Sequence, residues 1–122
     1  MNIHILLAED DKNLGFIIKN ELEEEHFSVD LVENGVEALL SFIENRQKII
    51  LLDIKMPKLD GINALRIMKK LDPDITVIAF SGNARQEEID EILRVGAEKC
   101  LIKPFEIQEL KTSIKERPCP PC

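Results

Sequence analysis

The sequence predicts an α/β fold built on a doubly wound, five-stranded parallel sheet, (βα)5, with helices on both faces. Five short runs rich in Ile, Leu and Val have the length and composition of buried strands: residues 3–8, 27–32, 49–53, 75–80 and 99–102. Apolar residues recur after each run at the spacing of one helix face. Strict alternation of strand and helix implies right-handed crossovers, which place helices over both faces of the sheet.

The helical segments show both apolar periodicity and boundary signals. The apolar stripes are Leu14, Ile17, Ile18 and Leu22; Val36, Leu39, Leu40 and Ile43; Leu65, Met68 and Leu71; Ile89, Ile92 and Leu93; and Ile107, Leu110 and Ile114. Capping and turn residues predict where helices begin and end. The signals are Asn34 with Glu37 at the start of the second helix, Asp60-Gly61 at the start of the third, Asp72-Pro73 at its end, and Gly96 at the end of the fourth.

Composition and charge narrow the class of protein. The 122 residues suit one domain with a single aliphatic core, since 44% are hydrophobic and only 4% aromatic. A net charge of −7 without a basic cluster disfavours direct binding to nucleic acid. No segment approaches the roughly 20 apolar residues of a membrane span. The short N-terminal apolar run meets three acidic residues, unlike a signal peptide, so we expect a cytoplasmic protein without membrane attachment.

Cysteine and histidine positions predict neither a disulfide framework nor a zinc site. Cys119 and Cys122 lie in a proline-rich stretch, and two cysteines fall short of four zinc ligands. We therefore expect residues 118–122 to form a short tail. His4 and His26 each lack a partner motif, and we assign neither a role.

Charged residues directly follow three of the predicted strands. The first strand runs into Glu9-Asp10-Asp11, the third ends on Asp53 and the fifth is followed by Lys103. Because the carboxyl ends of parallel strands share one edge of a sheet, we expect these side chains to converge. Clustered carboxylates suit Mg²⁺, and a lysine beside a carboxylate nucleophile can neutralise an incoming phosphoryl group. The pattern therefore predicts phosphoryl-transfer chemistry.

Five motifs, in order along essentially the whole chain, resemble those of bacterial response-regulator receiver domains. They are Glu9-Asp10; Asp53 with Met56-Pro57; Asp60-Gly61; Ser81-Gly82; and Lys103-Pro104. No single motif is specific, but the ordered set is. The resemblance implies that residues 2–117 form a receiver domain with the flavodoxin-like strand order 2-1-3-4-5. In that order the first and third strands are neighbours at the topological switch point, where open α/β sheets bind ligands.

The resemblance also implies a role for each residue of the acidic motifs. Asp53 would be the phosphoacceptor, attacking the phosphorus of a phosphohistidine to form an acyl phosphate. Asp10 and Asp53 would ligate Mg²⁺ directly, Glu9 through water, and Lys55 through its main-chain carbonyl. Asp11 is assigned instead to the start of the first helix.

Three further motif residues would act on the phosphoryl group. Ser81 would donate its hydroxyl to a phosphoryl oxygen, and Gly82 would let the backbone approach the same group. Lys103 would neutralise phosphoryl charge, aimed across the sheet edge by a cis peptide bond before Pro104.

Cys100 departs from the family pattern. Most receivers carry Tyr or Phe three residues before the lysine, and that ring moves inward as the Ser/Thr moves. A thiol cannot report the switch by a large ring rearrangement, so we expect Ser81 and residues 82–85 to carry the response. By family analogy, the output surface is expected near residues 84–93, 100 and 107–114.

Lys55 and Asn83 predict a long-lived phosphoryl group. They lie two residues after Asp53 and Ser81, and by family geometry they flank the path of the hydrolytic water. A lysine ammonium has no acceptor to take a proton from water, and it can instead pair with phosphoryl oxygens. Asn83 has no carboxylate beside it to act as a base.

The predicted function is that of a phosphoacceptor in two-component or phosphorelay signalling. The donor would be a histidine kinase or a histidine phosphotransfer protein, and the output a downstream protein target or effector domain. Because it would turn over no free metabolite, we do not expect an enzyme. A Mg²⁺-dependent phosphohydrolase of the haloacid-dehalogenase type would instead carry an aspartate where Lys55 stands. A flavodoxin-like cofactor-binding protein would need a Ser/Thr/Gly-rich loop where three acids follow the first strand.

Overall fold

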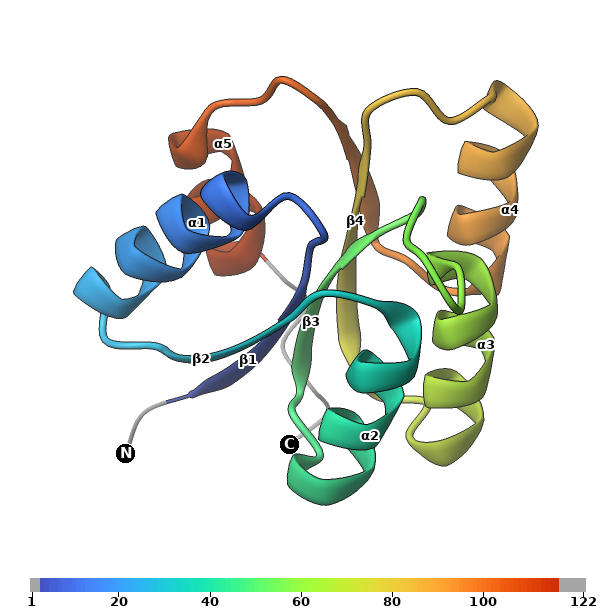
Figure 1. The fold of residues 1–122 in the computed structure, drawn as a ribbon, viewed down its shortest axis with the longest axis horizontal. Helices are drawn as coiled ribbons and strands as arrows, with labels where there is room; N and C mark the ends of the chain where they lie inside the picture. Colours follow the sequence, from blue (N-terminus) through green and yellow to red (C-terminus); the bar gives the residue numbers. More distant parts are fainter. Residues whose placement is uncertain (1–2, 117–122) are drawn as a thin grey trace.

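The computed structural model describes residues 3–116, in which five strands alternate with five helices (Figure 1). The strands are β1 (His4–Ala8), β2 (Ser28–Val32), β3 (Ile49–Asp53), β4 (Thr76–Ser81) and β5 (Lys99–Ile102). The helices are α1 (Lys12–Glu24), α2 (Gly35–Asn45), α3 (Gly61–Leu71), α4 (Gln86–Val95) and α5 (Ile107–Lys115). Each predicted strand agrees with the observed one to within one residue at either end. Cys119 and Cys122 lie outside the described residues.

The five strands form one parallel sheet in the order β2-β1-β3-β4-β5, which confirms the predicted topology. Strand β3 lies at the centre, between β1 and β4, and all five of its residues are buried. The register pairs Ala8 with Leu52 and Asp53 with Phe80. The carboxyl ends of β1, β3 and β4 therefore reach the same edge of the sheet.

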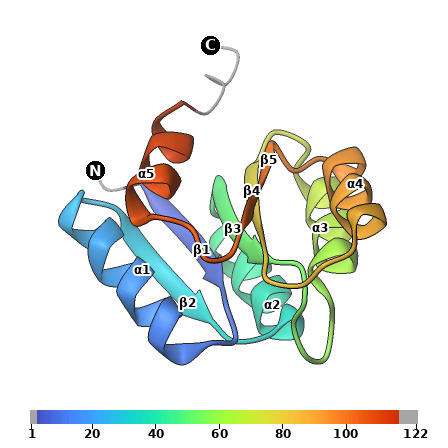
Figure 2. The same cartoon turned by 90° about the horizontal axis from the view of Figure 1, so that it is seen from above.

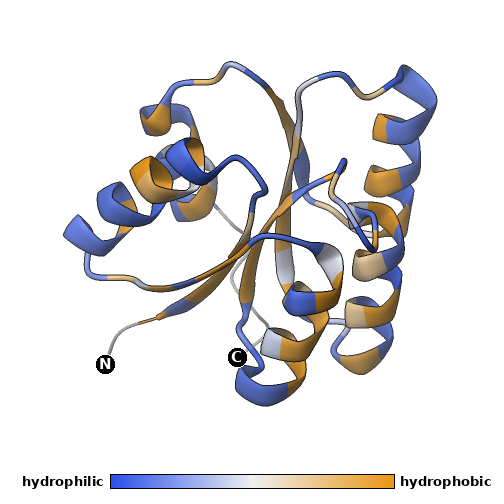
Figure 3. Cartoon of the chain, viewed as in Figure 1, coloured by the Kyte–Doolittle hydropathy of each residue, from blue (hydrophilic) through white to orange (hydrophobic). Residues whose placement is uncertain are grey.

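Helices α1 and α5 cover one face of the sheet, and α2, α3 and α4 cover the other (Figure 2). Alternate residues of β3 face the two layers: Ile50 and Leu52 pack with Phe42 and Met68, whereas Ile49 and Leu51 belong to the core under α1 and α5. The central strand β3 is accordingly apolar on both faces, while the helices carry polar residues on their outer sides (Figure 3). No helix among the described residues is long and apolar enough to cross a membrane.

Side-chain caps begin three of the helices at the predicted positions. Asp11, Asn34 and Asp60 are the N-caps of α1, α2 and α3, and each accepts a hydrogen bond from the backbone N–H three residues on. Such caps satisfy backbone donors that the first turn leaves unpaired. Gly96 ends α4 with a positive φ of 134°, a conformation that favours glycine.

Gly61 lets the start of α3 lie directly against the end of β3. Its N–H donates to the carbonyl of Ile54 at 2.9 Å, and a Cβ at this position would lie 2.4 Å from the carbonyl oxygen of Asp53. The close approach holds the β3–α3 connection against the strand that carries Asp53, so a side chain here would displace backbone at the sheet edge.

We predict that Gly61→Ala lowers the free energy of unfolding by about 1–3 kcal/mol, because overpacking against backbone outweighs the helix propensity of Ala. Urea unfolding of the two proteins measures the difference. Gly82→Ala is the matched control, since its Cβ would meet only the Lys103 side chain at 3.6 Å. Equal stability of Gly61→Ala and the wild type would contradict the close packing of α3 on β3.

Candidate functional site at the carboxyl edge of the sheet

Two carboxylates are buried side by side at the carboxyl edge of the sheet. Glu9 follows β1 directly and is 1% exposed, and Asp53 ends β3 and is 3% exposed. The Glu9 N–H donates to the carbonyl of Val32 at 3.0 Å, which extends the strand pairing by one residue beyond β1. Because β1 and β3 are neighbours, their last residues meet, as the predicted strand order requires.

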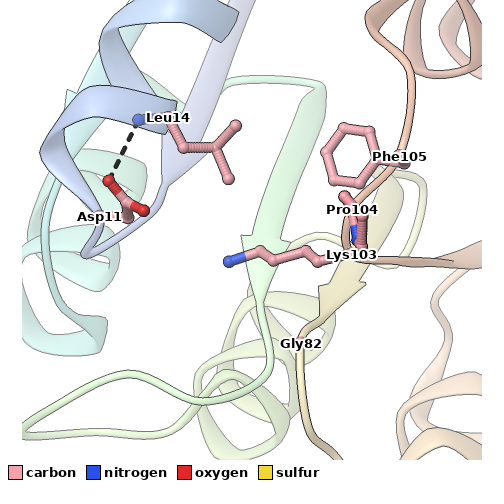
Figure 4. Close-up of a pocket in the computed structure, with 6 residues that line it drawn as sticks. All are labelled: Asp11, Leu14, Gly82, Lys103, Pro104 and Phe105. Carbon is pink, nitrogen blue, oxygen red and sulfur yellow. Dashed lines mark hydrogen bonds between the residues drawn. The ribbon is translucent and has the colours of Figure 1, made fainter.

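Lys103 joins these two carboxylates. Its Nζ lies 2.8 Å from Asp53 Oδ2 and 2.7 Å from Glu9 Oε1. The residue follows β5, and its N–H donates to the carbonyl of Ser81 at 2.7 Å. The Lys103–Pro104 peptide bond is cis, as the family resemblance implied. The side chain extends from β5 toward the end of β3 (Figure 4).

Two backbone amides hold the remaining carboxylate oxygens. The Lys55 N–H donates to Asp53 Oδ1 at 3.1 Å, and the Asp11 N–H donates to Glu9 Oε2 at 3.1 Å. Each acid therefore has one oxygen oriented by backbone and the other paired with Lys103. This double restraint orients both carboxylates before any ligand arrives.

The acidic residues predicted to hold a metal lie together. One carboxylate oxygen from each of Glu9, Asp10 and Asp53 can be chosen so that all three lie within 4.8 Å of one another. Asp10 is the exposed member, so the cluster opens to solvent on that side. Three hard oxygen donors around an open side match the preference of Mg²⁺, which keeps several of its waters. The donor set therefore fits that cation.

The pKa values of Glu9 and Lys103 are both raised, for different reasons. Burial raises the pKa of Glu9 to about 7, even though Lys103 and the Asp11 amide act to lower it. Burial acts to lower the pKa of Lys103, but its pairing with Asp53 and Glu9 outweighs burial and raises that pKa. Lys103 therefore stays an ammonium, and the buried negative charge of Glu9 is the unfavourable member of the pair.

Ser81 and Cys100 lie on the α4 side of the site. Ser81 is buried at the end of β4, and its Oγ accepts a hydrogen bond from the Ala84 N–H at 3.1 Å. Cys100 is half-buried and packs in the same apolar cluster as Ala84 and Ile89. Burial raises the pKa of the Cys100 thiol, so it remains protonated. The thiol therefore packs among apolar groups.

The two ends of Lys55 have different partners. Its backbone lies against Asp53, but its ammonium lies 3.0 Å from Glu88 Oε2 on α4. Sequence reasoning assigned no role to Glu88, the ion-pair partner of Lys55. A signal was present, because a glutamate three residues after a helix N-cap is typical of a capping box.

A cavity of about 400 Å³ opens beside the paired side chains (Figure 4). It is lined by Asp11, Leu14, Gly82, Lys103, Pro104 and Phe105. Phe105 stacks on Phe80 of β4, with ring centroids 5.0 Å apart, which anchors the β5–α5 connection over the core. The cavity gives a partner's side chain or a small molecule access to Lys103 from the α1 side.

Comparison with known proteins identifies the class that this fold and site define. Residues 5–115 match the family model of the response regulator receiver domain, so the chain belongs to that family. It is 41% identical over 113 residues to a transcriptional regulatory protein of Haemophilus influenzae, the CpxR homolog, covering 91% of this chain and 48% of that protein. It is 31% identical over 116 residues to sporulation initiation phosphotransferase F of Bacillus subtilis, covering 95% of this chain and 94% of that protein.

Solved structures agree with the family assignment. A CheY-like response regulator receiver domain protein from Methanospirillum hungatei superposes with a TM-score of 0.91 at 29% identity, covering 95% of this chain and 93% of that one. The Francisella response regulator 1452 receiver domain superposes with a TM-score of 0.85 at 35% identity, covering 93% and 94%. The chain spans about half the length of several curated relatives it matches. Membership in this family separates it from the phosphohydrolase and flavodoxin-like classes considered above.

We predict that Glu9→Gln stabilises the protein in the presence of a chelator above pH 7. A raised folded-state pKa means that the folded protein binds more protons than the unfolded chain, so stability falls as pH rises from 4.5 to about 7. The amide removes that penalty, which is on the order of 2 kcal/mol. Urea unfolding at both ends of this pH window measures it. The gain in stability should disappear near pH 4.5. The control variant Asp10→Asn, at an exposed neighbouring acid, should show no such gain. A gain in stability that is independent of pH would contradict the burial argument.

Proposed function

We propose that Asp53 is the phosphoacceptor and that its phosphoryl group comes from a phosphohistidine of a histidine kinase or a histidine phosphotransfer protein in the cytoplasm. The observation that carries this proposal is the position of Lys103, whose ammonium lies within 2.8 Å of both Asp53 and Glu9 at the carboxyl edge of the sheet. A buried carboxylate beside a fixed cation can attack phosphorus while the phosphoryl charge is neutralised. Membership in the receiver family supports the same chemistry.

The transfer exchanges one bond to phosphorus for another. The P–N bond of the donor breaks as a P–O bond to Asp53 forms, and the imidazole ring leaves with the electron pair. The Lys55 N–H holds Asp53 Oδ1, which keeps the carboxylate oriented at the edge of the sheet. Lys103 would pair with phosphoryl oxygens, and the Ser81 hydroxyl would donate to another. The protein contributes mainly orientation and electrostatic stabilisation.

Glu9, Asp10, Asp53 and the main-chain carbonyl of Lys55 would hold Mg²⁺. When bound, the cation would offset the repulsion between the attacking carboxylate and the phosphoryl oxygens. Lys103 would then share Glu9 and Asp53 with it. The exposed Asp10 is open to direct contact with the ion, and Glu9 would hold it through water.

The output of the switch would be a downstream protein target or an effector domain. Part of the expected output region belongs to the core, because Ile92, Leu110 and Ile114 are buried. Leu93 of α4 is an exposed apolar residue within that region, and the exposed Ile102 of β5 lies just outside it. We propose that a partner reads these two elements, since they lie next to the Ser81 loop.

We predict that acetyl phosphate or a small phosphoramidate adds one phosphoryl group to the protein when Mg²⁺ is present. The adduct should be lost in Asp53→Asn and with chelator, because the nucleophile or the charge-neutralising ion is then missing. Intact mass spectrometry measures the adduct. Asp74→Asn is the matched control, an exposed aspartate remote from the metal cluster, and should behave as wild type. Labelling that persists in Asp53→Asn would overturn the assignment.

We also predict that the acyl phosphate is long-lived compared with that of Lys55→Asn/Asn83→Glu. The double variant replaces an ammonium that cannot accept a proton and adds a carboxylate that can orient the attacking water. We expect its adduct to decay roughly tenfold faster. Phosphate release after removal of the donor gives both rates. Equal rates would mean that these two side chains do not set the lifetime.

A further inference from the structure

Glu88 uses each of its carboxylate oxygens for a different contact. Its Oε1 accepts a hydrogen bond from the Arg85 N–H at 3.0 Å, which caps the first turn of α4. Its Oε2 pairs with Lys55 Nζ at 3.0 Å. The Arg85 guanidinium is a second cation nearby, with Nε 3.6 Å from Oε1. The Glu88 side chain is only 20% exposed, so the two contacts hold it in one orientation.

Lys55 is likewise held at both ends. Its N–H donates to Asp53 Oδ1, and its ammonium reaches Glu88. One residue therefore connects the carboxylate proposed to accept the phosphoryl group to the first turn of α4. The ammonium is half-exposed and sits on a flexible stem, so it can change partners without moving the backbone.

The ion pairs of α4 divide between its two ends. Arg66 of α3 pairs with Glu91, which also binds Arg94 at 2.5 Å, and these contacts brace the middle and end of the helix. Among the ion pairs of residues 3–116, Lys55–Glu88 is the one that links the start of α4 to another element. Loss of the Lys55–Glu88 pair would loosen α4 at its N-terminal turn and leave the Arg66–Glu91 pair intact.

We infer that Glu88 is a positioning residue that holds the Lys55 ammonium away from Asp53 until the phosphoryl group arrives. This inference rests on the proposed phosphorylation of Asp53. The dianionic phosphoryl group competes with one carboxylate for the same ammonium, and Lys55 changes partner. The exchange shields the acyl phosphate and at the same time releases the first turn of α4. Phosphorylation thereby reaches α4 through charge competition, a route that needs no aromatic ring at position 100.

The test compares Glu88→Gln in two backgrounds. Glutamine keeps an oxygen for the Arg85 N–H and so retains the cap, but it loses the charge that holds Lys55. With Lys55 present, we expect the acyl phosphate of Glu88→Gln to last about two- to fivefold longer than in wild type, the range of a partly exposed ion pair. In a Lys55→Gln background, the same substitution should leave the lifetime unchanged. Glu87→Gln is the control, because Glu87 carries the same charge on the same turn without a contact to Lys55.

The outcomes separate this inference from the proposed function. A lifetime ratio that is equal in both backgrounds would mean that Glu88 acts only through the helix, and no effect in either would mean that Lys55 does not exchange; each overturns the inference. If wild type takes up no phosphoryl group, the proposed function fails and this inference fails with it.

A second readout follows the helix directly. In wild type, phosphorylation should shift the NMR resonance of the Arg85 amide, which donates to Glu88, and this shift should shrink in Lys55→Gln. An unchanged shift in Lys55→Gln would also overturn the inference.

Discussion

The bridge from Lys103 to Glu9 and Asp53 is the interaction on which the rest of the site depends. Two carboxylates that are almost completely buried would repel each other strongly without a cation between them. Lys103 supplies that cation from the far side of the sheet, which requires β5 to lie beyond β4 and the side chain to cross the end of the neighbouring strand. The strand order therefore places a cation where it offsets the repulsion between Glu9 and Asp53 at the sheet edge.

The same arrangement makes the site a source of instability. The pKa of Glu9 is raised to about 7 although Lys103 lies 2.7 Å away, so the ion pair does not fully offset burial. An apolar or neutral residue would suit the fold better at this position, as is common for buried charges. A cation with high charge density would bind here, because its charge offsets the negative charge that Lys103 does not fully neutralise. The local electrostatic cost and the affinity for a divalent ion thus have one physical origin.

The fold and most of the site could be predicted from the sequence because both follow from short-range patterns. Ile49–Asp53 is apolar on both faces and ends on a charge, which identifies a central strand and its carboxyl end. Asp11, Asn34 and Asp60 mark helix starts through local capping chemistry. The side-chain partner of Lys55 could not be predicted in this way, because 33 residues separate it from Glu88 and the contact depends on how α4 lies over the β3–α3 connection. Similarly, periodicity placed Leu110 and Ile114 on one helix face but could not tell a core-facing stripe from an output surface.

The residue at position 100, on the α4 side of the molecule, is a cysteine without an aromatic ring. It lies half-buried and packs in the same apolar cluster as Ala84 and Ile89, and its short side chain has no ring to move in or out. Two of the described contacts lead from residues near the carboxyl edge of the sheet to the start of α4. One is the Ser81 hydroxyl, which accepts from the Ala84 N–H just before the helix. The other is the Lys55 ammonium, which meets the helix at Glu88. Both contacts lie at the start of α4, so the response proposed above can be carried by a hydrogen bond and an ion pair without an aromatic side chain at position 100.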